Sequence, residues 1–495
     1  MPKYKKEDYK YKTEPFDHQD IVFKLSRDRE DFALLMEMGT GKTKVIIDTA
    51  AWLYARGKIE AVMVIAPNGV HSNWEGEIDI HLPDWVKRTV RIYSSRGNTK
   101  KYKKYMSALG TGDDLKIMLM NVEAMATKKG QAYASKFTRI YSCLTVVDES
   151  TRIKNPKAIR TKACIKAGRA SAYKRILTGT PVTQSPLDLY SQFDFLGDDI
   201  LGFSSYFAFK ARYAITMRRT NKRGGKTWFY DEIIDFCNLD ELTEKIDPYS
   251  YRVTKKECLD LPNKQYSQVR VTMSKDQKKI YEDMKASFRA ELDEGVTITA
   301  PLALTRLLRL QQILGGFVND EFSETHVIPG KNPKLDALMY DLEDVPDDVS
   351  VGIWARFRAE IECITDKLKE VYGKGSAASY YGGVKTEDRM KIIERFQAGD
   401  LRFFVGSPAA GAHGITLTKG SLVYYFSNDF SLENRIQSED RFHRIGQVNK
   451  VNYKDIVVPG TIDIHVLSAH KKKQGFADTV TGDLSTYKEI INDLS

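Results

Sequence analysis

The sequence has only five cysteines in 495 residues, and no two of them stand close enough to form a CxxC pair. This scarcity excludes a disulfide framework and a zinc site of that type, and it is typical of a reducing compartment. No apolar run is long enough to cross a bilayer, and the first residues lack the apolar core of a secretory signal. We therefore expect a soluble, intracellular protein without a membrane partner.

Low-complexity tracts and short repeats are also absent, and 42% of the residues are hydrophobic, which favours folded cores over disorder. The length exceeds what one core comfortably holds, so two or three domains are expected. Lysine and arginine number 76 against 66 acidic residues, giving a net charge of +10. This moderate excess permits a nucleic-acid partner and does not by itself establish one.

A glycine-rich segment near the start, Gly39-Thr40-Gly41-Lys42-Thr43, follows the apolar run 32–36 and leads into the helical pattern 45–53. Strand, turn and helix in this order are the context that a phosphate-binding loop requires. The N–H groups of such a loop and the N-terminus of the helix face an anion. Lys42 would then reach the β- and γ-phosphates of a nucleotide, and Thr43 would hold Mg²⁺ through its hydroxyl. The alternative is a glycine-rich turn beside a surface lysine.

Two carboxylates follow a short apolar run, 144–147, that is typical of a buried parallel strand. Ligands of α/β sheets bind at the carboxyl ends of such strands, where Asp148 and Glu149 are expected. Asp148 is suited to the Mg²⁺ shell, and Glu149 is suited to orienting and deprotonating the attacking water. An acidic turn that caps the next helix is the alternative, which the phosphate-binding loop upstream disfavours.

A segment near the other end of the chain, 437–447, carries two arginines, Arg441 and Arg444. Their spacing would present both on one face of a helix or a tight turn. A positioned guanidinium stabilises the negative charge that develops during phosphoryl transfer. We therefore predict a catalytic role for both arginines, delivered from a second lobe. Surface salt bridges to Glu439 or Asp440 are the alternative.

Apolar strand-like runs alternate with helical patterns in two parts of the chain, which predicts an α/β protein with two parallel-sheet lobes. The runs are 61–66, 116–120, 144–147 and 175–178 in the first part, and 349–354, 401–405, 422–426 and 451–458 in the second. Long helical patterns such as 276–292 and 302–314 dominate the segment between them. We expect a first lobe at 1–186, a mostly helical insertion at 187–333 and a second lobe at 334–495.

A basic and aromatic stretch, 210–230, lies within the expected insertion, and the pair Gly224-Gly225 predicts a hairpin tip there. Contact with nucleic acid and a solvated basic loop are equally compatible with this composition. The stretch contains Arg212, Arg218, Arg219, Lys222, Arg223, Lys226, Trp228, Phe229 and Tyr230.

The order of the motifs and the residues within them resemble those of the Swi/Snf family of superfamily-two helicase-like ATPases. The segments that carry this resemblance are 16–19, 66–70 with Trp74 and Glu77, 148–155, 177–181, 409–418 and 437–447. The most specific is 441–447, which reads Arg-Phe-His-Arg-Ile-Gly-Gln. Most strand-separating helicases instead have a motif that resembles Gln-Arg-x-Gly-Arg at the corresponding place.

The resemblance implies two RecA-like lobes that use ATP and Mg²⁺ and act on DNA. It makes 66–70 the first DNA-contact motif and 177–181 the motif that links hydrolysis to lobe movement. The nucleotide contacts that it implies are Gln19, Gly39, Thr40, Gly41, Lys42, Thr43, Gly414 and Gln437, with Thr43 and Asp148 at the metal. The DNA contacts that it implies are Lys154, Asn155 and Thr180, Arg252 and Lys255 ahead of the second lobe, and Ser407.

The sequence departs from the family pattern at several positions. Thr151 stands where the family usually has His, so a contact from the acidic segment to 177–181 is expected to differ. The other departures are Met36, Thr40, Ala412, His413 and Asp440. Lys42, Glu149, Arg441 and Arg444 are all present, which disfavours an inactive relative.

The sequence contains nothing that resembles a bromodomain, a zinc module or a nuclease. It is therefore similar to the minimal motors of phages and bacteria, and the expected location is a bacterial or phage-infected cytoplasm, or a nucleus. No protein partner is indicated.

The leading hypothesis is a DNA-dependent ATPase that translocates on duplex or branched DNA, in fork regression, branch migration, annealing or protein displacement. A strand-separating helicase for DNA or RNA is a second hypothesis, which the residues of the segment 441–447 and the helical insertion disfavour. A nucleotide-gated DNA clamp or scaffold without motor activity is a third, which the retained catalytic set disfavours.

Overall fold

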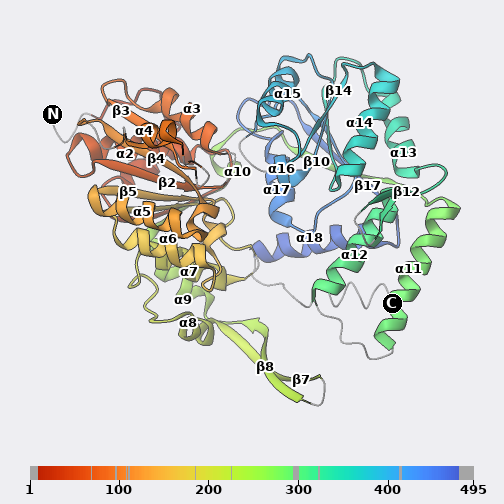
Figure 1. The fold of residues 1–495 in the computed structure, drawn as a ribbon, viewed down its shortest axis with the longest axis horizontal. Coiled ribbons are helices and arrows are strands. Elements are labelled where there is room, and N and C mark those ends of the chain that lie inside the picture. The colour runs from red at the N-terminus through yellow and green to blue at the C-terminus, as the bar shows by residue number, and fades with distance from the viewer. Residues whose placement is uncertain are drawn as a thin grey trace. The chain divides into compact units, whose positions relative to one another are not determined.

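The computed structural model describes residues 9–67, 70–94, 97, 99–107, 109, 112–183, 185–223, 226–293, 300–320, 324–411 and 415–478. It divides the chain into two compact units (Figure 1). Unit 1 comprises Met1–Arg219 and Phe229–Asp260, and unit 2 comprises Thr220–Trp228 and Leu261–Ser495. None of the helices in the described ranges combines the length and apolarity needed to span a lipid bilayer.

Unit 1 is built on a seven-stranded sheet in the order β3-β4-β2-β5-β6-β1-β9, and every neighbouring pair is parallel. Its inner strands are almost fully buried, as the continuous apolar runs predict for a parallel sheet covered on both faces. The strands are β1 (Asp31–Met36), β2 (Ala61–Ala66), β3 (Arg88–Ile92), β4 (Leu115–Asn121), β5 (Cys143–Asp148), β6 (Tyr173–Leu177) and β9 (Ser250–Val253).

Helices cover both faces of this sheet. On one face, side chains of α1 (Asp17–Ser26), α2 (Lys42–Ala55) and α3 (His71–His81) share a core with alternate residues of the strands. On the other face, α5 (Lys128–Ile140), α6 (Ile159–Arg169) and α7 (Leu189–Leu196) share a second core with the intervening residues. The remaining elements are α4 (Lys100–Ser107), α8 (Tyr206–Tyr213), α9 (Leu239–Ile246), α10 (Lys255–Cys258) and the 3₁₀ turns η2 (Val122–Ala126), η3 (Ser150–Ile153), η4 (Pro186–Asp188) and η5 (Asp247–Tyr249).

Unit 2 is built on a six-stranded sheet in the order β10-β17-β16-β13-β15-β14, which is also parallel throughout. The expected pair of parallel-sheet α/β lobes is therefore confirmed. The strands are β10 (Lys264–Arg270), β13 (Val351–Trp354), β14 (Ala377–Tyr380), β15 (Phe403–Gly406), β16 (Leu422–Tyr425) and β17 (Val451–Val457). A short antiparallel hairpin, β11 (Phe317–Asn319) and β12 (Thr325–Val327), is separate from this sheet.

Two cores again lie on opposite faces of the unit 2 sheet. One contains side chains of α12, α13, α14 and α18, and the other contains Phe396 of α15 together with Phe442. The helices are α11 (Lys275–Asp293), α12 (Ala300–Leu314), α13 (Pro333–Glu343), α14 (Arg358–Tyr372), α15 (Thr386–Ala398), α16 (Pro408–Gly411), α17 (Leu432–Asp440) and α18 (Ile462–Asp478).

The segment expected to form a mostly helical insertion, 187–333, differs from that expectation. Its first helices complete the unit 1 core through residues such as Phe193 and Phe209, whereas Leu307 and Ile313 of α12 belong to a unit 2 core. The strand β9 extends the unit 1 sheet beside β1, and β10 extends the unit 2 sheet beside β17. The described part of this segment is thus divided between the two units, because its apolar side chains complete two separate cores.

The basic stretch forms a two-stranded ribbon of β7 (Ala214–Arg223) and β8 (Lys226–Phe236), which extends away from α8 and α9 (Figure 1). The predicted hairpin is therefore present, although its tip, Gly224-Gly225, lies outside the described residues. Arg218 lies 4.7 Å from the ring centre of Phe229, and Arg219 forms a 2.7 Å ion pair with Glu232. The side chains of Arg218 and Arg219 are exposed to solvent.

Candidate nucleotide-binding site

The predicted phosphate-binding loop connects β1 to α2, at the carboxyl edge of the unit 1 sheet. Gly39 and Gly41 both have positive φ angles, 76° and 87°, in the left-handed region that favours glycine. At Gly41 a Cβ would also lie 2.1 Å from Nε2 of Gln19, so a side chain there would displace the glutamine. The two glycines give the loop its tight turn, as expected from the sequence.

Side chains of α1 hold this loop from outside. Gln19 Nε2 donates to the carbonyl of Thr40 at 3.0 Å, and the backbone N–H of Phe16 donates to Gln19 Oε1 at 3.0 Å. His18 Nε2 lies 2.8 Å from the same Thr40 carbonyl and bonds it in the tautomer that carries a proton on Nε2. Both side chains are buried, so the segment 16–19 fixes the shape of the loop. His18 is a contributor that the motif alone did not indicate.

Lys42 is the first residue of α2, and its ammonium contacts the chain just before the loop 39–43. Lys42 Nζ donates to the carbonyls of Met36 at 2.8 Å and Glu37 at 3.3 Å. Thr43 follows it in the first turn and is half-buried. The loop, the Lys42 ammonium and the N-terminus of α2 therefore lie together, and the binding of a phosphate by them stays a prediction.

The two carboxylates stand at the end of β5. Asp148 accepts a 2.9 Å hydrogen bond from Nε1 of Trp74 on one oxygen and a 3.0 Å bond from the N–H of Glu149 on the other. Burial raises the pKa of Asp148, while the bond from Trp74 and the charge of Lys42 oppose that rise. Trp74 is fully buried and orients this carboxylate, a role that its place in the expected DNA-contact motif did not suggest.

Glu149 has an unusual backbone conformation. Its φ and ψ of 51° and 60° are left-handed, and only Asn238 shares a positive φ among the described non-glycine residues. Strained backbone of this kind costs energy and clusters at functional sites. The left-handed conformation of Glu149 comes directly after Asp148, the last residue of β5.

The donors in this region fit a magnesium ion. Mg²⁺ prefers hard oxygen ligands, and it usually takes only one or two of them from protein carboxylates. The Thr43 hydroxyl and the buried Asp148 carboxylate supply oxygens of that kind at the carboxyl edge of one sheet. Burial penalises the charge on Asp148, and a bound cation would offset that penalty.

The acidic segment is linked to the segment 177–181 through α7. Ser150 Oγ donates to Gln192 Oε1 at 2.6 Å, and Gln192 Nε2 donates to the carbonyls of Pro181 and Asp188, each at 2.8 Å. Ser150 and Gln192 are completely buried. One contact between the two motifs thus runs from Ser150 through a glutamine that lies outside both motifs.

The expected DNA contacts of unit 1 lie on or after strands of the same sheet but differ in how buried they are. Lys154 Nζ lies 2.5 Å from Thr183 Oγ1 and 3.5 Å from Asp188 Oδ2. Asn155 is exposed, as is Arg252, whereas Thr180 is half-buried. Lys255 is buried, with only 5% of its surface exposed, and a DNA contact at this residue stays a prediction. Both Arg252 and Lys255 belong to unit 1, through β9 and α10.

Unit 2 brings the two predicted arginines together. Arg441 follows the last residue of α17, and its Nη1 donates to the carbonyl of Ile415 at 3.4 Å. Arg444 Nη1 donates to the same carbonyl at 3.3 Å and to Thr416 Oγ1 at 3.0 Å. Both guanidinium groups therefore donate to the carbonyl of Ile415.

The other predicted residues of unit 2 lie around the same motif or elsewhere on the sheet. Gln437 is buried in α17 and donates from Nε2 to Glu433 Oε1 at 3.1 Å. Ser407 follows β15, and its Oγ accepts from the N–H of Ala410 at 3.3 Å, so it caps the short helix α16. Gly414, together with the departures Ala412 and His413, lies outside the described residues.

Comparison with known proteins gives two family matches. Residues 21–316 match the SNF2-related domain, and residues 333–446 match the helicase conserved C-terminal domain. Among solved structures, the chain resembles the Sulfolobus solfataricus SWI2/SNF2 ATPase core in complex with dsDNA, with 23% identity and a TM-score of 0.43. That alignment covers 99% of this chain and 98% of the other.

Curated relatives include bacterial and eukaryotic proteins. The chain is 26% identical to the uncharacterized ATP-dependent helicase MG018 of Mycoplasma genitalium, over 92% of this chain and 40% of the relative. It is 24% identical to the putative ATP-dependent helicase/translocase YwqA of Bacillus subtilis, over 90% of this chain and 46% of the relative. It is 24% identical to the transcription regulatory protein SNF2 of Saccharomyces cerevisiae, over 88% of this chain and 26% of the relative. The chain spans less than half the length of each of these relatives.

Proposed function

Because this chain belongs to the SNF2-related family of ATP-hydrolysing, helicase-like enzymes, we propose that it couples Mg²⁺-dependent ATP hydrolysis to movement along duplex DNA. The observation that carries the proposal is the convergence of three motifs at one edge of the unit 1 sheet. The phosphate-binding loop follows β1, the carboxylate pair ends β5, and Gln192 joins the segment after β5 to the segment after β6.

We propose that the loop 39–43 holds the phosphates of ATP, with Lys42 on the β- and γ-phosphates. Gln19 donates one of its two amide N–H groups to Thr40, and we assign the second to the adenine. Gly414 and Gln437 would complete the nucleotide contacts from unit 2. These assignments rest on the shape of the loop and on the family motifs.

Thr43 and Asp148 would hold Mg²⁺, which, when bound, neutralises charge on the phosphate oxygens. Glu149 would orient the attacking water and accept its proton. Arg441 and Arg444 would stabilise the charge that develops on the γ-phosphate, as positioned arginines do in related phosphoryl transfers.

Binding to DNA would rest on phosphate contacts, because a motor that moves along its track cannot depend on base identity. The net charge of +10 is compatible with this partner, and one similar protein, of Danio rerio, is named chromodomain-helicase-DNA-binding protein 1-like. The proposed contacts are Lys154, Asn155, Thr180, Arg252, Lys255 and Ser407, together with the β7–β8 ribbon. Of these, Asn155 and Arg252 are exposed.

One comparison tests the proposed function against its alternatives. ATP turnover would be measured with duplex DNA, single-stranded DNA and RNA as activators, followed by a strand-displacement assay. We expect duplex DNA to be the strongest activator and strand displacement to be absent. Displacement of strands would identify a helicase instead, and DNA binding without stimulated turnover would identify a clamp.

A separate prediction concerns the β7–β8 ribbon. Replacing Arg218, Arg219, Lys222 and Arg223 by Ala is expected to weaken DNA-stimulated turnover and to leave turnover without DNA unchanged. Each lost phosphate contact should flatten the slope of log affinity against log salt by about 0.9. Binding of one duplex across a salt series measures this slope.

The matched control removes the same amount of charge from a surface of unit 1 outside the ribbon. Four lysines of α4 are exposed, so replacing Lys100, Lys101, Lys103 and Lys104 by Ala should leave the salt slope unchanged. An unaltered slope in the ribbon variant would make the ribbon a solvated surface element with no part in DNA binding.

A further inference from the structure

The chain passes from unit 1 to unit 2 for the last time between Asp260 and Leu261, and residues that follow contact the arginine motif. We define this junction segment as residues 262–266. The carbonyl of Pro262 lies 2.6 Å from His443 Nε2, which donates to it in the tautomer that carries a proton there. His443 immediately precedes Arg444, so the junction segment contacts the backbone neighbour of that arginine.

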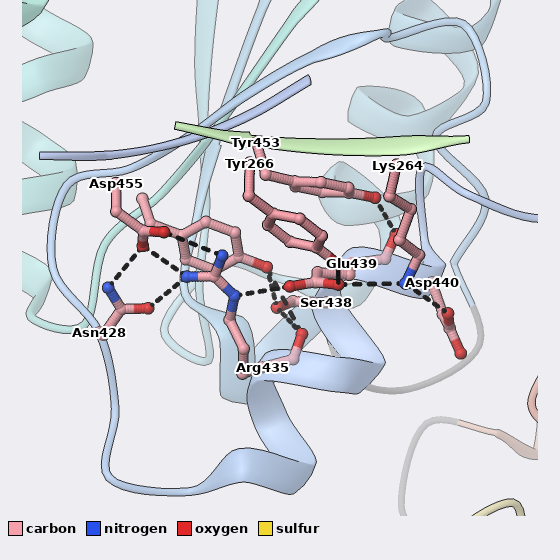
Figure 2. Close-up of polar contacts among 10 residues, drawn as sticks. Lys264, Tyr266, Asn428, Arg435, Ser438, Glu439, Asp440, Tyr453 and Asp455 are labelled. Carbon is pink, nitrogen blue, oxygen red and sulfur yellow. Dashed lines mark hydrogen bonds and ion pairs between the residues drawn. The ribbon is translucent and has the colours of Figure 1, made fainter. Parts of the chain in front are cut away.

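Two further side chains of the junction segment reach α17, on which Glu439 lies. Lys264 Nζ forms a 3.1 Å ion pair with Glu439 Oε2 and lies 3.8 Å from Asp440 Oδ1. The hydroxyl of Tyr266 donates to Glu439 Oε2 at 2.7 Å. Figure 2 shows these groups gathered around the carboxylate of Glu439. Glu439 and Asp440 are the last two residues before Arg441, so this contact also adjoins an arginine.

Glu439 also connects the junction segment to Arg435, one turn earlier on the same face of α17, and to Tyr453 of β17. Its second oxygen accepts from Arg435 Nε at 2.8 Å, and its backbone carbonyl accepts from the hydroxyl of Tyr453 at 2.8 Å. Burial by itself would raise the pKa of Glu439, but the charges of Lys264 and Arg435 bring it down to about 2. The carboxylate is therefore ionised at neutral pH and holds both cations.

Arg435 in turn fixes α17 to the sheet. Its Nη1 and Nη2 lie 2.5 and 3.2 Å from the two oxygens of Asp455 on β17, and its Nη1 donates to Asn428 Oδ1 at 2.7 Å. The guanidinium carbon lies 3.5 Å from the ring centre of Tyr425 on β16. The helix is thus held between β17, through Arg435, and β10, through Lys264 and Tyr266 (Figure 2).

Apolar packing alone would hold a helix on a sheet at lower cost, because burying charged groups carries a desolvation penalty that their attraction only partly offsets. Directional contacts between charged groups, by contrast, fix the position of the helix on the sheet. Here they fix the two residues next to the arginine pair, and one set of these contacts comes from the point where the chain enters unit 2. A displacement of this junction would therefore move α17 with it.

We propose that the junction segment 262–266 is a positioning element that sets Arg441 and Arg444 for phosphoryl transfer through Glu439 and His443. This inference rests on the proposed function, in which the arginines stabilise the transferred phosphate. It adds that the connection between the units, through Lys264 and Tyr266, controls how well the arginines act. Lys264 and Tyr266 are positioning residues, since they act through α17.

The test compares Lys264→Met with Lys454→Met in the full-length chain, at saturating duplex DNA. Lys454 is a matched control, because it also forms a lysine ion pair from the same sheet, 2.6 Å from Asp341, away from α17. Misplacing the arginines should lower kcat by about 10- to 100-fold in Lys264→Met. The KM for ATP should stay unchanged, and Lys264→Arg, which keeps the charge, should restore turnover.

A second readout separates positioning from general destabilisation. The complex of ADP and aluminium fluoride mimics the transferred phosphate, so its affinity should fall in Lys264→Met by the same factor as kcat, while the affinity for ADP alone stays constant. Tyr266→Phe removes only the hydroxyl that contacts Glu439 and should give a smaller loss of the same kind. This variant decides the test if Lys264→Met does not fold.

The positioning role is overturned if Lys264→Met and Tyr266→Phe match Lys454→Met in kcat and in affinity for ADP with aluminium fluoride. It is also overturned if a folded Tyr266→Phe is unaffected when Lys264→Met fails to fold. An Arg444→Ala variant is measured in parallel. Normal turnover in that variant would overturn the arginine assignment itself, and that result is distinct from a failure at the junction segment.

Discussion

Replacing Glu149 by Gln is expected to lower ATP turnover by about 10²- to 10⁴-fold, since a neutral amide cannot accept the proton of the attacking water. The phosphate-binding loop and Lys42 remain intact in this variant, so ATP should bind with nearly unchanged affinity. Steady-state hydrolysis and equilibrium binding of a fluorescent ATP analogue measure the two properties separately.

Two further variants are compared with Glu149→Gln. Lys42→Ala should abolish hydrolysis and also weaken ATP binding, because the lysine contacts the phosphates in the ground state as well as during transfer. Glu123→Gln is the matched control, since Glu123 is an exposed carboxylate of unit 1 that pairs with Arg160 at 2.8 Å. Near-normal turnover in Glu149→Gln would place the general base at another residue.

The sequence predicted the central strands of both sheets well, for a physical reason. Parallel strands covered on both faces are apolar throughout, so β2 and β5 appear as unbroken hydrophobic runs and were predicted nearly to the residue. The edge strands lack this signal. In β9 and β10 most residues are only half-buried or exposed, and their polar composition conceals the strand period.

That difference explains the altered domain organisation. With β9 and β10 undetected, the segment 187–333 shows helical patterns and a single hairpin, which favours a separate, mostly helical insertion. The structure instead gives each sheet one of these strands as an outer member. Which core a helix completes depends on the sheet beside it, and that information is absent from the period of the helix itself.

The residues of the candidate site also differ in how well the sequence predicted them. Motifs that lie within one turn of chain, such as the loop 39–43 and the pair Asp148–Glu149, were predictable because their chemistry and their backbone are local. The contacts that hold them join distant segments: Trp74 is 74 residues from Asp148, and Lys264 is 175 residues from Glu439. Such pairs form when whole elements pack together, so no pattern within one short segment predicts them.

A local pattern can also mislead about the side chain that it contains. The family resemblance implied a DNA contact at Lys255, yet its side chain is buried and its backbone N–H donates to Glu37 Oε2 at 2.7 Å. Glu37 lies between β1 and the loop 39–43, so α10 is joined to the segment that leads into this loop. Arg252, on β9, keeps the expected exposure.

The arginine motif allows a prediction with an effect as large as that at Glu149. Replacing Arg444 by Ala should reduce turnover by about 10³- to 10⁵-fold and change ATP affinity little, because the guanidinium would act mainly on charge that develops during transfer. Arg358→Ala is a suitable control, since Arg358 is an exposed arginine of unit 2 that pairs with Glu362 at 2.8 Å.

Arg444 also bonds Ile415 and Thr416, so its loss is expected to loosen that segment, and the experiment has to separate this effect from the catalytic one. Arg444→Lys does so: it keeps a positive charge near the segment but lacks the planar fork that engages two oxygens at once. We expect this variant to recover thermal stability and to remain impaired in turnover, as measured by thermal unfolding and steady-state hydrolysis. If both variants lose stability alone, with normal turnover, the arginine holds the segment 415–416 and takes no part in phosphoryl transfer.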